Sequence, residues 1–165
     1  MAAETLTADR ALSGFPVGGV GPATALHVAT GTYEIAANVE DGDIFEMCKL
    51  PANAVVVGGM LYAEDLDTNA TETLDMDIGW AANGSDAADP DGFGNLGVWT
   101  GDAITDWKVV ASNMFPLQGV LITGGPKKFA AETTVQVEAN AAAATGGTGT
   151  MTVVVYYFID PNFSV

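Results

Sequence analysis

The sequence predicts an all-β chain that folds as an antiparallel β-sandwich, with a jelly roll as the favoured topology. Three observations lead to this fold class. The 20 glycines among 165 residues suit short strands joined by tight turns. About eight apolar or alternating segments are separated by turn residues, without a helical pattern of four turns or more. The segment 150–159 is the longest run of β-branched and aromatic residues.

The first part of the chain, residues 1–23, is expected to form an extended N-terminal arm, followed by the sandwich domain over residues 24–165. Pro16 and Pro22, together with the glycines around them, prevent a helix beyond Ala11. Such arms fray unless something holds them, so we expect this one to lie against a neighbouring subunit.

The first half of the domain shows the pattern of strands separated by turns. Leu74, Met76 and Ile78 alternate with polar residues, a period of two that favours a half-buried strand with its aspartates pointing outward. Gly31 is interpreted as a turn between two short strands. The expected strands are 24–30, 32–37, 44–49, 54–62 and 71–80.

The second half contains an expected long loop, residues 81–97, of a length that is often functional in compact domains. A short helical turn is expected within 103–110, and strands over 114–123, 128–140 and 150–159. The last strand is apolar on both alternating faces, which predicts a central position in its sheet. One face would be covered by the second sheet and the other by a neighbouring subunit or a loop.

The charge of the chain limits its partners. There are 21 acidic and 5 basic residues, for a formal net charge of −16, so binding to nucleic acid phosphates is not expected. No stretch approaches the roughly 18 apolar residues of a membrane span, and the N-terminus lacks a signal-peptide pattern, so we expect a protein made in the cytoplasm. The acidity fits either solubility in a salty medium or a cationic partner.

Catalysis is not expected from the residue inventory. His27 is the single histidine and Cys48 the single cysteine, so the chain has neither the ligands of a zinc site nor an intrachain disulfide. A Cys48–His27 pair would act as nucleophile and base only if folding brought the two side chains together.

Carboxylate clusters are the one chemical feature that points to a ligand. Asp65, Asp67 and Asn69 have the alternate spacing of a calcium loop. However, Ala70 stands where that loop has a glycine, and Met76 where it has a glutamate. Such clusters are more often solvated turns, so we expect no cofactor, with calcium as the one considered. The candidate metal ligands are Asp65, Asp67, Asn69, Asp89 and Asp91.

Two segments carry a resemblance to a known class of proteins. Residues 49–59, Lys-Leu-Pro-Ala-Asn-Ala-Val-Val-Val-Gly-Gly, and residues 74–80, Leu-Asp-Met-Asp-Ile-Gly-Trp, resemble a type of small structural protein from tailed viruses. The resemblance implies an auxiliary capsid protein, a decoration or cement protein on the outer face of an HK97-type shell. Such proteins are often β-rich and trimeric and have no catalytic residues.

The expected function is therefore to stabilise a capsid from outside by clamping neighbouring major capsid proteins, as a homotrimer. Two alternatives stay open: a calcium-dependent carbohydrate-binding jelly roll, and another virion component such as a tail, fibre or head-to-tail joining protein. The candidate contact residues lie in the arm and around the expected loop 81–97. They are Leu6, Leu12, Phe15, Pro16, Val17, Phe93, Leu96 and Trp99.

Overall fold

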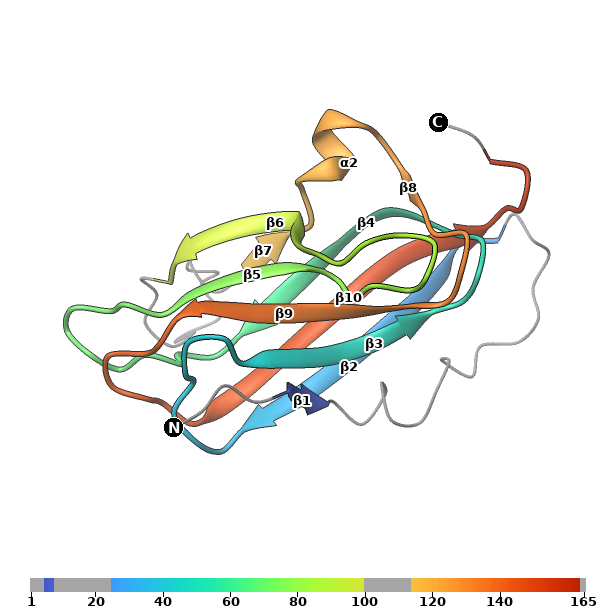
Figure 1. Cartoon of the computed structure of the whole chain (residues 1–165). Coiled ribbons are helices and arrows are strands. Elements are labelled where there is room, and N and C mark those ends of the chain that lie inside the picture. The colour runs from blue at the N-terminus through green and yellow to red at the C-terminus, as the bar shows by residue number, and fades with distance from the viewer. Residues whose placement is uncertain (1–4, 8–24, 100–113, 164–165) are drawn as a thin grey trace.

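The computed structural model describes residues 5–7, 25–99 and 114–163 of the chain, and they form two five-stranded sheets packed face to face (Figure 1). Every strand pair is antiparallel except β1 with β3, which is parallel. The predicted antiparallel β-sandwich is confirmed. The jelly-roll topology stays a prediction, with which the alternation of the chain between the two sheets agrees.

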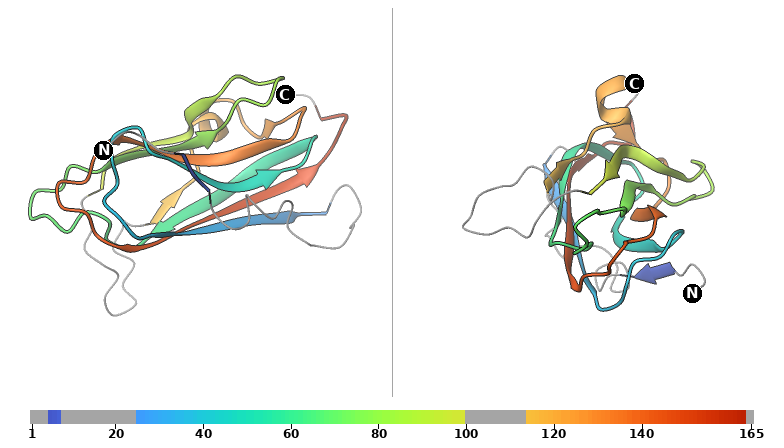
Figure 2. Two further views of the ribbon diagram at one scale, coloured as in Figure 1. Left: turned by 60° about the horizontal axis from the view of Figure 1, so that its bottom comes forward. Right: turned by 90° about the vertical axis from the view of Figure 1, so that its left-hand side faces the viewer.

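We name the two layers sheet A and sheet B; Figure 2 shows them from the side and from one end. Sheet A has, in spatial order, β1 (Thr5–Thr7), β3 (Ile44–Leu50), β9 (Thr133–Ala141), β5 (Asp75–Trp80) and β6 (Asp89–Val98). Sheet B has β2 (His27–Ile35), β10 (Gly149–Ile159), β4 (Ala54–Ala63) and β7 (Met114–Pro116), with β8 (Lys127–Lys128) also paired to β4. The short helix α2 (Val120–Thr123) follows β7.

The core lies between the sheets and follows the predicted alternation. Met76 and Ile78 are fully buried, as expected for the inward side of β5. At one end, Trp80 meets the rings of Phe93 and Phe129 edge-on, with centroids 5.0 and 5.2 Å apart. These aromatic contacts join β5, β6 and the segment after β8 into one core.

The last strand, β10, is central in sheet B, as predicted, because it pairs with β2 on one side and β4 on the other. Val153 and Val155 are fully buried against sheet A, whereas Tyr156 on the opposite face is 37% exposed. The paired glycines of β4, Gly58 and Gly59, lie beside a register shift opposite Tyr156 and Tyr157.

Gly31 corrects the first expected strand pair. It is not a turn: β2 runs unbroken from His27 to Ile35, with Gly31 at its centre and paired with Val153. A Cβ at Gly31 would overlap the backbone carbonyl of Met47 in β3. The glycine is therefore used for a close approach of the two sheets rather than for a change of direction.

Other boundaries also differ from the sequence-based expectation, and the strand expected over 71–80 begins only at Asp75. The prediction of a loop over 81–97 is wrong for its second half, since β6 pairs with β5 from Asp89 onward. The strand over 114–123 ends at Pro116, and residues 128–140 are divided between β8 and β9. Residues 103–110 lie outside the described part of the chain. Among the described residues, no helix has the length and apolar character needed to cross a membrane.

Candidate functional site

Asp67, a candidate calcium ligand, is instead a buried acceptor of backbone hydrogen bonds. It is only 2% exposed. Its Oδ2 accepts from the backbone N–H groups of Thr73 (2.7 Å), Leu74 (3.1 Å) and Ala144 (3.0 Å). Its Oδ1 accepts from the backbone N–H groups of Thr145 (3.0 Å) and Asn69 (3.3 Å). The carboxylate thus ties the segment after β4 to the turn before β10.

The electrostatics of Asp67 follow from these donors. Burial by itself raises the pKa of this carboxyl, but the N–H groups of Thr73, Thr145, Ala144 and Leu74 outweigh it and lower the pKa to about 2. The lone pairs that would bind a cation already face N–H groups. The charged form of Asp67 therefore has a structural role, which its calcium-like spacing from Asp65 and Asn69 does not indicate.

Asp65 and Asn69 take part in the same loop. The Asp65 Oδ1 accepts from the backbone N–H of Asp67 at 3.2 Å, and the Asn69 Oδ1 accepts from the N–H of Thr71 at 2.9 Å. The Asn69 amide also donates to the Thr145 hydroxyl at 2.8 Å. Both side chains close Asx turns, as Asp and Asn do in loops.

The other two candidate ligands, Asp89 and Asp91, form an acidic pair next to a lysine. Burial raises the pKa of Asp89, a hydrogen bond with Asp91 and the charge of Asp91 raise it further, and Lys127 opposes them. Across the described residues, no three His, Cys, Asp or Glu side chains are grouped so that they could hold a metal ion.

Lys127 connects this acidic region to the core. Its Nζ lies 2.7 Å from the Asp86 Oδ1, 4.9 Å from the ring centroid of Trp80 and 5.1 Å from that of Phe129. The Trp80 Nε1 donates to the Ala87 carbonyl at 3.1 Å. The loop after β5 is thereby fixed over the aromatic end of the core.

Replacing Lys127 by methionine is expected to lower the free energy of unfolding by about 1 to 2 kcal/mol, because the apolar stem stays while the charge that faces Asp86 and two rings is lost. The matched control is Lys49→Met, which removes an exposed ion pair with Glu132 at 3.6 Å and should cost less than about 0.5 kcal/mol. Urea unfolding followed by circular dichroism measures both; equal losses would contradict the special role of Lys127.

Sheet A carries an acidic face on the side that points away from the core. We define it by Asp75 and Asp77 of β5, Asp91 of β6 and Glu138 of β9; Asp77 lies directly opposite Glu138 and is itself only 5% exposed. Burial raises the pKa of Asp77 against hydrogen bonds from Asn140 and Leu96, and the charges of Asp75 and Asp91 raise it further. Burial and the charge of Asp77 also raise the pKa of Glu138.

Sheet B carries the contrasting surface, which we name the apolar face. It is formed by the outward side chains of three neighbouring strands: Val28 and Thr30 of β2, Val154 and Tyr156 of β10, and Met60 and Tyr62 of β4. Most large apolar side chains that are exposed in the described part of the chain lie on these strands or next to them. The outward apolar side of 150–159 was predicted from the sequence, but its extension over β2 and β4 was not, although uncharged residues at alternate positions of 28–32 were a usable signal.

Phe93 and Trp99 were expected to contact a partner, and the structure corrects both. Phe93 is fully buried in the aromatic core, and Trp99 is 4% exposed with its ring 4.9 Å from that of Phe115. Phe93 lies within β6, whose pairing with β5 directs its side chain into the core. Trp99 directly follows β6, and its backbone N–H donates to the Leu74 carbonyl at 2.8 Å. Neither side chain is available on the surface of the chain.

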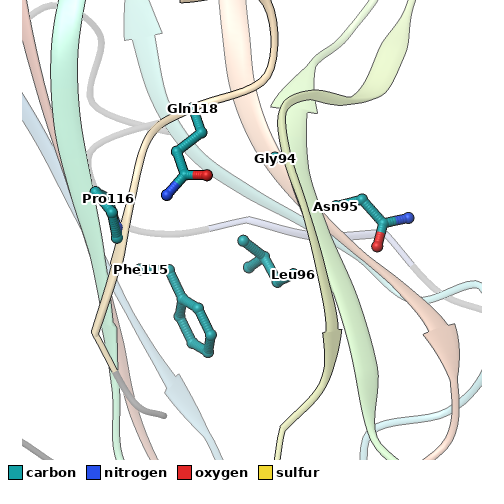
Figure 3. Close-up of a pocket in the computed structure, with 6 residues that line it drawn as sticks. All are labelled: Gly94, Asn95, Leu96, Phe115, Pro116 and Gln118. Carbon is teal, nitrogen blue, oxygen red and sulfur yellow. The ribbon is translucent and has the colours of Figure 1, made fainter. Parts of the chain in front are cut away.

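Leu96 is half-buried beside a small cavity between β6 and β7 (Figure 3). The cavity has a volume of about 190 Å³ and is lined by Gly94, Asn95, Leu96, Phe115, Pro116 and Gln118. This lining contains two amides and no titratable side chain, and the volume is below that of ordinary ligand pockets. The arm residues Leu12, Phe15, Pro16 and Val17 lie outside the described residues, and the contact role of Leu6 stays a prediction.

Cys48 is fully buried, and this burial raises the pKa of its thiol to about 12. The side chain is therefore a neutral thiol at ordinary pH and is not suited to nucleophilic attack. The ring of His27 stacks on Tyr157 with centroids 5.4 Å apart. Both residues act as packing groups in sheets A and B.

No protein-family model matches the sequence, and no curated protein matches it either. Solved structures do match the fold. A chain in the capsid asymmetric unit of cyanophage Pam1 is 25% identical, with a TM-score of 0.61, over 88% of this chain and 91% of that chain. A chain in the capsid of Ralstonia phage GP4 is 21% identical, with a TM-score of 0.67, over 96% and 99% of the two chains.

A third similar chain comes from the acid-stable capsid structure of the Helicobacter pylori bacteriophage KHP30. It is 15% identical, with a TM-score of 0.55, over 82% of this chain and 89% of that chain. All three likenesses span most of both chains. The fold is thus one that occurs in phage capsid structures, which confirms the predicted resemblance to a capsid-related phage protein.

Proposed function

We propose that this chain is a structural, non-enzymatic virion protein that binds the outer surface of a phage capsid and stabilises it by clamping neighbouring major capsid proteins. The observation that carries the proposal is the similarity to nearly whole chains within three capsid structures. The acidity adds support for an outer position, since a net charge of −16 would be repelled by packaged DNA on the inside.

The mechanism is additive. Each copy contributes a moderate contact to the shell and to sister copies, and many copies on one particle multiply it by avidity. The assembly we propose is a homotrimer, and the arm over residues 1–23 is one of its contacts. We propose that this function needs no metal ion, because the carboxylate of Asp67, a candidate ligand, already accepts hydrogen bonds from backbone N–H groups.

Undecorated shells mixed with the protein are expected to bind it in a saturable way and to become more resistant to heating. Co-sedimentation measures occupancy, and calorimetry of the shells measures their melting temperature. Light scattering should give three times the chain mass of 16.9 kDa, unchanged by a chelator. A chain that does not bind shells, or a mass that falls in chelator, would count against the proposal.

Deleting residues 1–15 should abolish shell binding while the sandwich stays folded, since among the described residues this removes only the short β1 from the edge of sheet A. Circular dichroism of the deleted protein is the control for folding. Normal occupancy after the deletion would remove the arm from the set of contacts.

A further inference from the structure

We propose that the apolar face of sheet B is the surface through which the chain docks on the capsid shell, against a flat, uncharged, apolar surface of a shell protein. The inference rests on the proposed function and adds to it an orientation. The acidic face of sheet A then points away from the shell, because sheets A and B are the two opposite layers of the sandwich (Figure 2) and each face is on the outer side of its sheet.

The apolar face is a contiguous surface formed by three paired strands. Cross-strand rungs run over β2, β10 and β4: Tyr156 lies opposite Val28 and Gly58, and Val154 opposite Thr30 and Met60. Val28 is 45% exposed and Tyr156 37%. Apolar side chains that stand side by side on a sheet and remain exposed mark a binding surface when they are contiguous.

The charged side chains of the described residues lie away from the apolar face. The rungs of the apolar face carry no ionisable group except the phenols of its tyrosines, although the chain has 21 acidic residues. The nearest carboxylates stand at one end, where Glu34 Oε2 accepts from the Thr150 hydroxyl at 2.9 Å and Glu64 Oε2 from the Thr150 backbone N–H at 2.7 Å. Burying an unpaired carboxylate in an interface is costly, so an acidic chain docks most readily through its uncharged face.

The area of the apolar face favours the capsid shell over a second copy of the chain as its binding partner. Three strands about 4.8 Å apart, over some six residues each, make a patch on the order of 300 Å². A stable pairwise complex buries about 800 Å² on each partner, so two free chains would not dimerise through this patch alone, and their like net charges oppose it further. A small contact is sufficient where many copies bind one particle. The shape is open as well, since a Cβ at Gly58 would meet nothing within 4 Å.

The test compares shell binding by variants of the full chain. Tyr156→Glu is expected to weaken co-sedimentation with undecorated shells at least tenfold, because it places a carboxylate on the central strand of the face. Val28→Thr keeps a β-branched side chain of the same size and should weaken binding severalfold with little effect on folding. The matched control is Ile122→Glu, which adds the same charge at a 71% exposed apolar residue of α2, away from the face. It should bind as the wild type does.

The possible outcomes distinguish failure of the docking face from failure of the proposed function. Wild-type binding by Tyr156→Glu and Val28→Thr would overturn the docking face and leave the proposed function intact, whereas wild-type protein that fails to bind shells would overturn the function itself. Equal weakening by Ile122→Glu would show a general charge effect and overturn the inference. If light scattering shows that Val28→Thr breaks an oligomer of the free protein, the face is occupied by a second copy instead of the shell.

Discussion

The Gly31→Val variant is expected to unfold much more readily than the wild type, with a free energy of unfolding lower by about 3 kcal/mol or more. A Cβ at this position would overlap the carbonyl oxygen and carbon of Met47. Those are backbone atoms of β3 in the opposite sheet, so no change of side-chain rotamer can make room. Either the two sheets move apart locally or β2 detaches from β10.

Gly58→Val is the matched control for this prediction. Gly58 belongs to the same sheet, but a Cβ there meets nothing within 4 Å. Valine favours strands, so the stability should change by less than about 0.5 kcal/mol. Urea unfolding monitored by circular dichroism compares the two variants. Similar losses at Gly31 and Gly58 would show that a general strand effect, and not the contact with Met47, is responsible.

The Asp67→Ala variant is the second with a large expected effect, a loss of about 3 to 5 kcal/mol in the free energy of unfolding. Removing the carboxylate leaves five backbone N–H groups without their acceptor. They come from the loop before β5 and the turn before β10, and Asp67 itself is 2% exposed. Water cannot easily replace an acceptor at this depth.

The same carboxylate predicts acid sensitivity with a defined sign. The pKa of Asp67 is lowered to about 2 in the folded chain, against about 3.9 for an ordinary aspartate. The stability that its charged form contributes, about 2 kcal/mol, is therefore complete above pH 4 and is lost as the pH falls through 2. Urea midpoints measured between pH 5 and pH 2 should show this decline.

Two variants isolate the contribution of Asp67 to the pH dependence. Asp67→Asn should be less stable at pH 7 and should lack this part of the decline, because its amide does not titrate. Asp41→Asn removes an exposed acid on a turn and should keep the wild-type profile. An unchanged profile in Asp67→Asn would mean that other carboxyls cause the acid sensitivity.

The sequence predicted the main strands because their signals are local. Alternation of Leu74, Met76 and Ile78 with polar residues, and the apolar run 150–159, depend on side-chain period alone, and both segments form strands with the expected inward sides. The signal failed at Phe93 and Trp99. Glycine and aspartate around Phe93 favour a turn locally, but pairing of β6 with β5 overrode that preference. Trp99 is held next to β6 by its backbone hydrogen bond to Leu74.

Asp67 shows the same limit at the level of a site. Its spacing from Asp65 and Asn69 is typical of a calcium loop, and nothing nearby in the sequence contradicts that interpretation. The deciding donors are the N–H groups of Ala144 and Thr145, which lie 77 and 78 residues further along the chain. A contact of that separation exists only after β4 and β10 have paired in sheet B.

By itself the sequence determined the all-β class, the strong acidity and the doubly apolar last strand. Only the tertiary structure decided what flanks that strand. Because strand pairing is long-range, β10 alone could not show that Val28 and Thr30 from β2 and Met60 from β4 would extend Val154 into one uncharged surface. The separation of this surface from the acidic face of sheet A is a property of the sheet order, which local residue patterns do not encode.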